Sequence, residues 1–110
     1  MDNIKNDSYY VKKIVKDLKF IIENTSGILI QELKVNEVLC DSMLFRLIQI
    51  SENSVKLTDD FKQMHNYIPW QAIKGMRNKI VHEYGDVDFG VVYQTITEDI
   101  PEIYHKLSII

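Results

Sequence analysis

The sequence contains few of the residues that mark several common classes of protein. It has one cysteine, two prolines and four glycines in 110 residues. A single cysteine cannot form an internal disulfide, which is typical of proteins from a reducing compartment, so we expect a cytoplasmic protein. So little proline and glycine excludes a collagen-like, proline-rich or glycine-linker chain.

Long apolar runs are missing as well. No uncharged apolar stretch approaches the roughly 20 residues that a membrane span requires. Residues 1–7 are polar and lack the apolar core of a secretory signal peptide. We therefore expect neither secretion nor a membrane partner.

Charge and length narrow the remaining classes. Asp and Glu number 16 against 13 Lys and Arg, which gives a net charge of −3. This balance excludes a broad basic surface for nucleic acid, although a small local basic site remains compatible with it. Apolar residues make up 45% and charged residues 26%, an ordinary globular mixture. The length suits one domain, which we assign to residues 1–110.

Apolar residues recur at steps of three and four along nearly the whole chain, which is the period of an amphipathic helix. A first helix is predicted over residues 11–22 and their flanks, because Asn6, Asp7 or Ser8 can cap its start and Gly27 can end it. Residues 28–33 are apolar but are not assigned to an element. A longer second helix is predicted after Asn36, with a candidate break at residues 57–59.

Two further helices follow. Pro69 suits the first turn of the third helix, which is predicted to stop at Gly85. Asp86 or Asp88 caps a fourth helix with an apolar stripe over residues 89–107, and Pro101 should kink or break it. The sequence therefore predicts an all-α fold, a four-helix up-and-down bundle with a kinked or split last helix.

Basic side chains gather in one segment of this acidic chain, residues 74–85, which includes Lys74, Arg77, Lys79 and His82. Histidine exchanges a proton near neutral pH, and its place near a helix C-terminus favours the protonated form. Arginine carries a permanent charge in a fork that suits phosphate. Arg77 and His82 together suit metal-independent cleavage of RNA, in which a ribose 2′-hydroxyl attacks the phosphorus and leaves a cyclic phosphate.

The spacing of these residues raises a geometric question. On an ideal helix Arg77 and His82 differ in direction by roughly 140°, whereas Asn78 and His82 share a face. Either the last turn before Gly85 unwinds, or two copies of the helix combine their groups across a twofold axis. Glu52 falls in the predicted buried part of the second helix and would need a partner there, such as Arg46 or Arg77.

These residues resemble a known family, the HEPN proteins. The order Arg77, four further residues, His82, Glu83 and Tyr84 resembles the Arg-x4-His-x-Tyr signature of that family. Residues 46–53 resemble its second-helix motif, with Ser51 and Asn53 where the family usually has Gly and Ala. Residues 68–70 and 99–102 are also similar to family segments, so the resemblance covers most of the chain.

The wider resemblance is to small HEPN toxins of toxin–antitoxin pairs, which are encoded beside a minimal nucleotidyltransferase antitoxin. It implies a homodimer with the motif helices at an interface cleft, and a ribonuclease in which Arg77 and His82 are catalytic. It also implies that the cognate nucleotidyltransferase transfers AMP to the hydroxyl of Tyr84. Asn78, Glu52 and Lys79 are candidates for supporting or RNA-binding roles.

A second class of function also fits the sequence. A non-catalytic helical module that binds a nucleotidyltransferase partner or a nucleotide would account for the acidity and the absence of a broad basic surface. Cys40 is alone, and His65 and His105 have no metal-ligand spacing with other residues. We therefore expect no metal and no cofactor under either interpretation.

Overall fold

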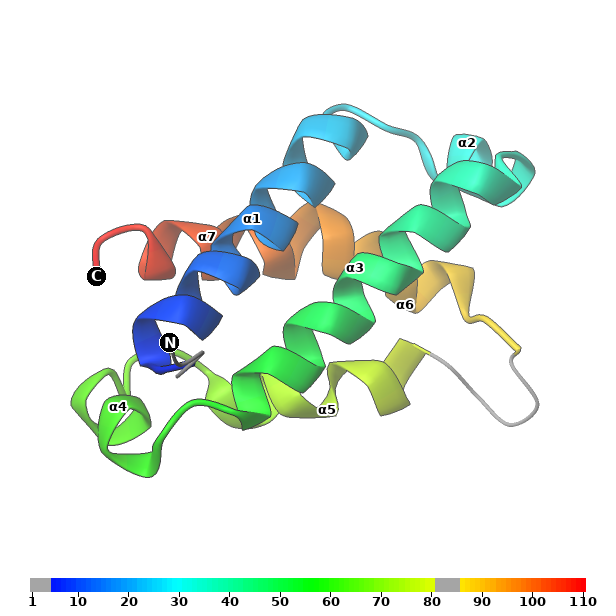
Figure 1. Cartoon of the computed structure of the whole chain (residues 1–110). Helices are drawn as coiled ribbons and strands as arrows, with labels where there is room; N and C mark the ends of the chain where they lie inside the picture. The colour runs from blue at the N-terminus through cyan, green and yellow to red at the C-terminus, as the bar shows by residue number, and fades with distance from the viewer. Residues whose placement is uncertain (1–4, 81–85) are drawn as a thin grey trace.

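The computed structural model describes residues 5–80 and 86–110, and every regular element within these ranges is helical. In chain order the elements are α1 (Asp7–Thr25), α2 (Ile30–Val35), α3 (Glu37–Val55), α4 (Asp59–Met64), α5 (Trp70–Ile80), α6 (Phe89–Gln94), the π-helical segment η2 (Thr95–Asp99) and α7 (Ile100–Leu107) (Figure 1). The predicted all-α bundle is confirmed, and its four main segments are α1, α3, α5 and the continuous run from α6 to α7.

The helix starts follow the predicted capping residues. The side-chain oxygen of Asn6 accepts a hydrogen bond from the Tyr9 amide at 3.0 Å, and that of Asn36 accepts one from the Leu39 amide at 3.0 Å. Of the two candidate caps for the last segment, Asp88 is the one used, because its carboxylate accepts from the Val91 amide at 3.1 Å. These caps satisfy amides that have no partner inside their own helix.

The predicted second helix is two helices, with the break at residues 57–59 as expected. α3 ends at Val55, and the Thr58 hydroxyl caps α4. The carboxylate of Asp7, at the start of α1, accepts hydrogen bonds from the Thr58 amide at 2.8 Å and the Thr58 hydroxyl at 2.7 Å. The first turn of α1 is therefore tied to the loop that separates α3 from α4.

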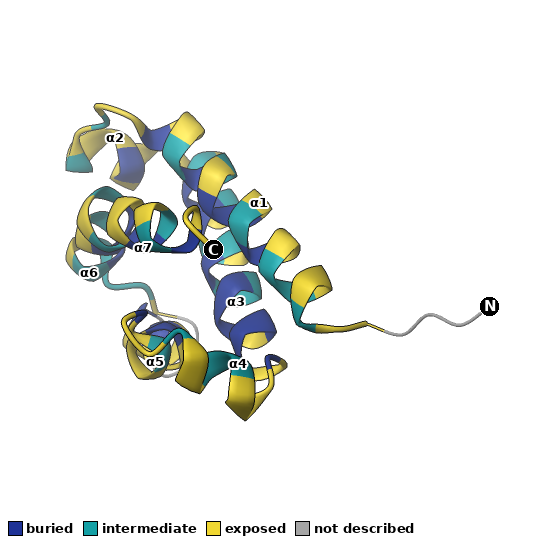
Figure 2. Ribbon diagram, turned by 90° about the vertical axis from the view of Figure 1, so that its left-hand side faces the viewer, coloured by how far each residue is buried: buried dark blue, intermediate teal, exposed yellow. Residues whose placement is uncertain are grey.

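The core lies where α1, α3 and the last helical segment meet. α1 packs against α3 and α7, and α3 packs against α5 on its other side. Buried and exposed positions alternate along these helices with the helical period (Figure 2). Fully buried side chains include Ile14, Leu18 and Ile21 of α1, Met43, Leu47 and Ile50 of α3, Ile73 and Ile80 of α5, and Ile96 and Ile100 of the last segment. Each contributes about 1.5–3 kcal/mol by leaving water.

Pro101 splits the last helix in a specific way. A proline has no N–H, and its ring would meet the carbonyl four residues earlier, that of Thr97. The backbone widens into the π-helical segment η2 directly before it, where the Ile100 amide donates to the Thr95 carbonyl. The kinked or split last helix is therefore confirmed, and its axis runs on through η2 without a loop.

Candidate functional site

Helix α5 carries the described part of the predicted site. Ile73, Met76 and Ile80 are buried at a spacing of three and four, so this face of the helix turns toward the bundle. The indole nitrogen of Trp70 donates to the carbonyls of Lys62 at 3.2 Å and His65 at 3.1 Å. The packed face and the anchored first turn together determine which side chains of α5 point outward.

Ser51 connects α3 to α5 close to the motif. Its buried hydroxyl donates to the Lys74 carbonyl at 2.7 Å, three residues before Arg77. A glycine at this position would allow the two helices to approach but would leave out this hydrogen bond. Ser51 therefore holds the two helices together where the HEPN resemblance departs from the usual glycine.

Arg77 and Asn78 are exposed on α5. Arg77 forms no ion pair and no side-chain hydrogen bond with any residue in the described ranges. An unpaired guanidinium keeps all its donors available for an anion such as a phosphate. The arrangement therefore suits the predicted role of Arg77, which stays a prediction.

Lys79 does not lie beside Arg77. Two residues along a helix correspond to a rotation of roughly 200°, so the two side chains leave opposite flanks of α5. The ammonium of Lys79 is 3.9 Å from a carboxylate oxygen of Asp99, in an exposed pair worth little in water. The structure thus separates Lys79 from the flank that Arg77 occupies.

Glu52 differs from the expectation. It is exposed on α3 and makes no hydrogen bond or ion pair among the described residues, so the expected burial is wrong. The expected partner Arg46 instead donates to the carboxylate of Asp17 at 2.7 Å. Six residues along a helix turn Arg46 and Glu52 to directions roughly 120° apart, which is why Arg46 reaches α1 and Glu52 does not.

The two remaining residues of the predicted site, His82 and Tyr84, lie outside the described residues, and their roles stay predictions. Among the residues that are described, no three His, Cys, Asp or Glu side chains come together in a way that could hold a metal ion. No helix in the same ranges is long and apolar enough to cross a membrane.

Gly75 lies in the interior of α5, between the Ser51 contact and Arg77. A Cβ atom built on it would meet no atom within 4 Å. Glycine in a helix interior costs about 1 kcal/mol relative to alanine. Packing within the described part of the subunit therefore gives no reason for a glycine here, whereas the close approach of another molecule would.

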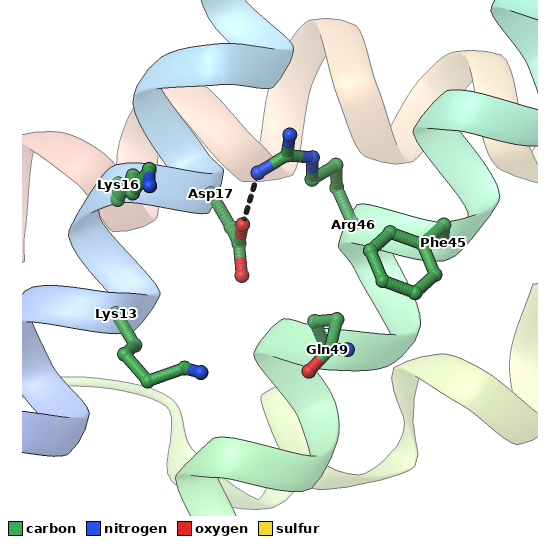
Figure 3. A pocket seen from close by; sticks show the side chains of 6 residues that line it. All are labelled: Lys13, Lys16, Asp17, Phe45, Arg46 and Gln49. Atoms are coloured by element: carbon green, nitrogen blue, oxygen red, sulfur yellow. Dashed lines mark hydrogen bonds and ion pairs between the residues drawn. The ribbon is translucent and has the colours of Figure 1, made fainter.

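A polar hollow that the sequence did not predict lies between α1 and α3, with a volume of about 250 Å³ (Figure 3). It is lined by Lys13, Lys16 and Asp17 of α1 and by Phe45, Arg46 and Gln49 of α3. The spacing of Lys13, Lys16 and Lys19 on the predicted first helix was the available signal, because three-residue steps place lysines along one side of a helix.

Comparison with known proteins agrees with the motif in indicating a ribonuclease family. Residues 14–110 match the family model described as "Ribonuclease HepT-like". The chain is 32% identical to a protein named as an RNase from Caldanaerobacter subterraneus subsp. tengcongensis, over 96% of this chain and 94% of the relative. It is 34% identical to a protein named as a ribonuclease HepT from Thermococcus cleftensis, over 90% of each chain.

A more distant relative is a protein named as an RNase from Methanocaldococcus jannaschii, 26% identical over 92% of this chain and 93% of the relative. No solved structure gives a significant match. The match covers at least 90% of the length of each of these three relatives.

Proposed function

The chain belongs to the ribonuclease HepT-like family, and from this premise we propose that it is an endoribonuclease that uses Arg77 and His82. The observation that carries the proposal is the family match over residues 14–110, which spans the whole of α5 and the motif after it. The guanidinium of Arg77 supports it, because it is exposed and has no partner among the described residues, which leaves its donors available for a phosphate.

The proposed reaction needs only groups of the RNA and the protein. The 2′-hydroxyl attacks the adjacent phosphorus, His82 accepts the hydroxyl proton, and a new bond joins the 2′-oxygen to phosphorus. The bond from phosphorus to the 5′-oxygen then breaks, and the leaving oxygen receives the proton that His82 took up, so the histidine returns to its starting form. Arg77 stabilises the negative charge that develops on the phosphoryl oxygens. The products are a 2′,3′-cyclic phosphate and a 5′-hydroxyl.

We further propose that two subunits complete each site. Arg77 and His82 differ in direction by roughly 140° on one ideal helix, so a second copy of α5 is the simplest way to bring both groups to one phosphate. Gly75 supports a close contact between α5 and a second subunit, because it leaves room on this helix that the described part of the subunit does not fill. The interface would then run along the outer flank of α5.

The decisive experiment is an RNA cleavage assay with purified protein in the presence of a metal chelator. We expect the wild type to cut single-stranded RNA and to leave cyclic phosphate ends. Arg77→Ala and His82→Ala should each lower the rate at least about 10²-fold, the lower end for a lost proton-transfer group. The control Lys34→Ala removes an exposed charge on α2 and should cut normally.

Two outcomes would contradict the proposal. The first is that the wild type leaves every RNA uncut. The second is that His82→Ala cuts as fast as the wild type. If the uncut result is accompanied by stable binding of a nucleotidyltransferase, and if this binding persists in Arg77→Ala and His82→Ala, the non-catalytic interaction module replaces the ribonuclease.

We propose that the activity is that of a toxin and that a partner nucleotidyltransferase switches it off at Tyr84. The tyrosine oxygen would attack the α-phosphorus of ATP, so that AMP is joined to Tyr84 and pyrophosphate leaves. The added phosphate carries negative charge and bulk in the same motif as Arg77, where it would compete with the RNA phosphate.

Co-expression with the nucleotidyltransferase followed by intact-mass measurement tests the switch. We expect the mass to rise by one or more AMP units and the modified protein to lose RNA cleavage. Tyr84→Phe keeps the ring and removes the acceptor oxygen, so it should stay unmodified. An unchanged mass in the wild type, or an equal gain in Tyr84→Phe, would overturn the assignment of Tyr84.

A further inference from the structure

The hollow between α1 and α3, called here the α1–α3 groove, has an unusual set of charges for this chain. The groove brings Lys13, Lys16 and Arg46 together with a single carboxylate, that of Asp17, so its local charge is positive although the whole chain carries −3. The side chains come from both helices and surround an open space (Figure 3). A positive hollow on an acidic protein indicates a site for an anionic ligand.

One wall of the α1–α3 groove is held rigidly. The guanidinium of Arg46 donates to one oxygen of Asp17 at 2.7 Å and lies 3.9 Å from the centre of the Phe20 ring. The side chain of Asp17 is 9% exposed and that of Arg46 24% exposed. A partly buried ion pair that also stacks on a ring keeps its geometry without a ligand, as a prepared binding site requires.

Helix α3 also offers an aromatic surface to the groove. Phe45 lies on the rim with 56% of its surface exposed, so a face of its ring is available to a ligand. The amide of Gln49 reaches toward the same open space, and so does the second oxygen of Asp17 (Figure 3). The groove therefore combines cations, hydrogen-bond acceptors and a flat apolar face.

The combination of cations, hydrogen-bond acceptors and an aromatic ring favours some anionic ligands over others. A bare phosphate would meet repulsion from the second oxygen of Asp17, and a lipid headgroup would make no use of the ring of Phe45. A nucleotide matches all three features, because its phosphate is anionic, its base stacks on aromatic rings, and the base edge carries N–H donors for a carboxylate or an amide.

The size of the groove indicates a polymer rather than a free metabolite. Its volume of about 250 Å³ is below the range of roughly 300–1,000 Å³ that is usual for small-molecule pockets. A second hollow of about 250 Å³ adjoins it, lined by Lys16, Lys19, Phe20 and Glu23, and shares Lys16 with it. Both hollows lie along α1, so lysines of this helix are available to a chain that extends beyond one unit.

We propose that the α1–α3 groove binds a single-stranded segment of RNA at a distance from the cleavage site. The backbone phosphates contact Lys13 and Lys16, and one base stacks on Phe45 with its edge toward Asp17 and Gln49. The inference deepens the proposed function, because the bound RNA is the substrate whose other part reaches Arg77. The groove then sets affinity for long RNA, and the motif residues carry the chemistry.

The test measures binding without cleavage, in the His82→Ala background. A fluorescently labelled single-stranded RNA of about 16 nucleotides, the upper end of single-strand site sizes, is titrated with protein at several salt concentrations. The groove variant is Lys13→Ala with Lys16→Ala. Its matched control is Lys34→Ala with Lys106→Ala, which removes the same charge from α2 and α7.

Binding to the groove predicts different effects for the two kinds of contact. The lysine pair variant should bind at least about tenfold more weakly, and its salt slope should shrink by about 0.7 for each lost phosphate contact. Phe45→Ala should weaken binding by about tenfold and leave the slope unchanged, because stacking releases no counterions. The control pair should bind as the His82→Ala background does. All three groove positions are exposed, so helicity should stay constant.

Equal weakening in the groove variant and in the control pair would overturn the inference, because the effect would then be one of net charge. Unchanged RNA binding combined with loss of nucleotidyltransferase binding would overturn it too, in favour of a protein interface. Cleavage by the wild type is measured separately. If RNA binding depends on the groove but no RNA is cleaved, the proposed ribonuclease function is wrong and this inference stands. If RNA is cleaved normally but its binding does not depend on the groove, the inference is wrong and the proposed function stands.

Discussion

Replacing Gly75 by alanine should raise the stability of the subunit and lower its activity, so the substitution distinguishes the two properties. The glycine lies inside α5, and an added Cβ would meet no atom within 4 Å. The substitution therefore has no steric cost within the described part of the subunit, and the helix gains about 0.8–1 kcal/mol in propensity. For a chain of this length that gain corresponds to a rise in Tm of about 4 °C.

The same methyl group should weaken the proposed dimer if a second subunit packs closely on the Gly75 flank of α5, because it would fill the space that the glycine leaves there. Thermal unfolding is measured at several protein concentrations, since dimer dissociation makes Tm concentration-dependent. Analytical ultracentrifugation and RNA cleavage are measured on the same samples. We expect a higher Tm at low concentration together with weaker association and slower cleavage.

Gly90→Ala serves as the control, because Gly90 is also helical but lies on α6. Its added Cβ would be 3.4 Å from the side chain of Asp88, an ordinary contact distance, so a smaller gain in stability and no change in cleavage are expected. If Gly75→Ala is more stable, equally dimeric and equally active, the close approach at α5 does not exist and the interface lies elsewhere.

Three other predictions concern the core and its polar contacts. Asn53 is 5% exposed, and its amide nitrogen has no hydrogen-bond partner among the described residues, so Asn53→Ala should leave the free energy of unfolding unchanged or raise it. Ser51→Ala removes a hydrogen bond and should lower the free energy of unfolding by about 1 kcal/mol. Chemical denaturation measures both, and a large loss of stability in Asn53→Ala would contradict the reasoning. Asp17→Ala leaves Arg46 unpaired and should cost about 1.5–3 kcal/mol in the same assay, an expectation that an unchanged midpoint would refute. Burial and the neighbouring charge of Asp41 raise the pKa of the Cys40 thiol. Alkylation of Cys40 near neutral pH should therefore be slow in the folded protein, and it should accelerate as pH rises or when the chain unfolds. Rapid labelling of the native protein at neutral pH would argue against this expectation.

Most of the fold was predictable because capping and periodicity are local signals. Asn6, Asn36 and Asp88 cap helices at the expected places, and the break before α4 follows the cap at Thr58. The form of the split at Pro101 was not predictable. A proline shows only that the helix must change, whereas the structure continues through a π-helical segment that contacts α1.

The candidate site was predicted less completely than the fold. Glu52 was expected to be buried because apolar residues surround it in the sequence, but apolar residues on a helix do not imply burial of all its faces. Phe45 shows the reason, since it belongs to the same apolar stretch and is 56% exposed. The pairing of Arg46 with Asp17 joins residues 29 positions apart, and no local pattern reports such a contact.

Mixing two inactive variants tests most directly whether two subunits share one site. Arg77→Ala and His82→Ala are each prepared as inactive protein, combined in equal amounts, and allowed to exchange subunits before the RNA cleavage assay. Half of the dimers are then mixed, and each mixed dimer restores one of its two sites if Arg77 and His82 come from different subunits, so about a quarter of the wild-type rate should return. If subunit exchange is verified and no cleavage returns at any ratio, both groups act within one subunit and the shared site is wrong.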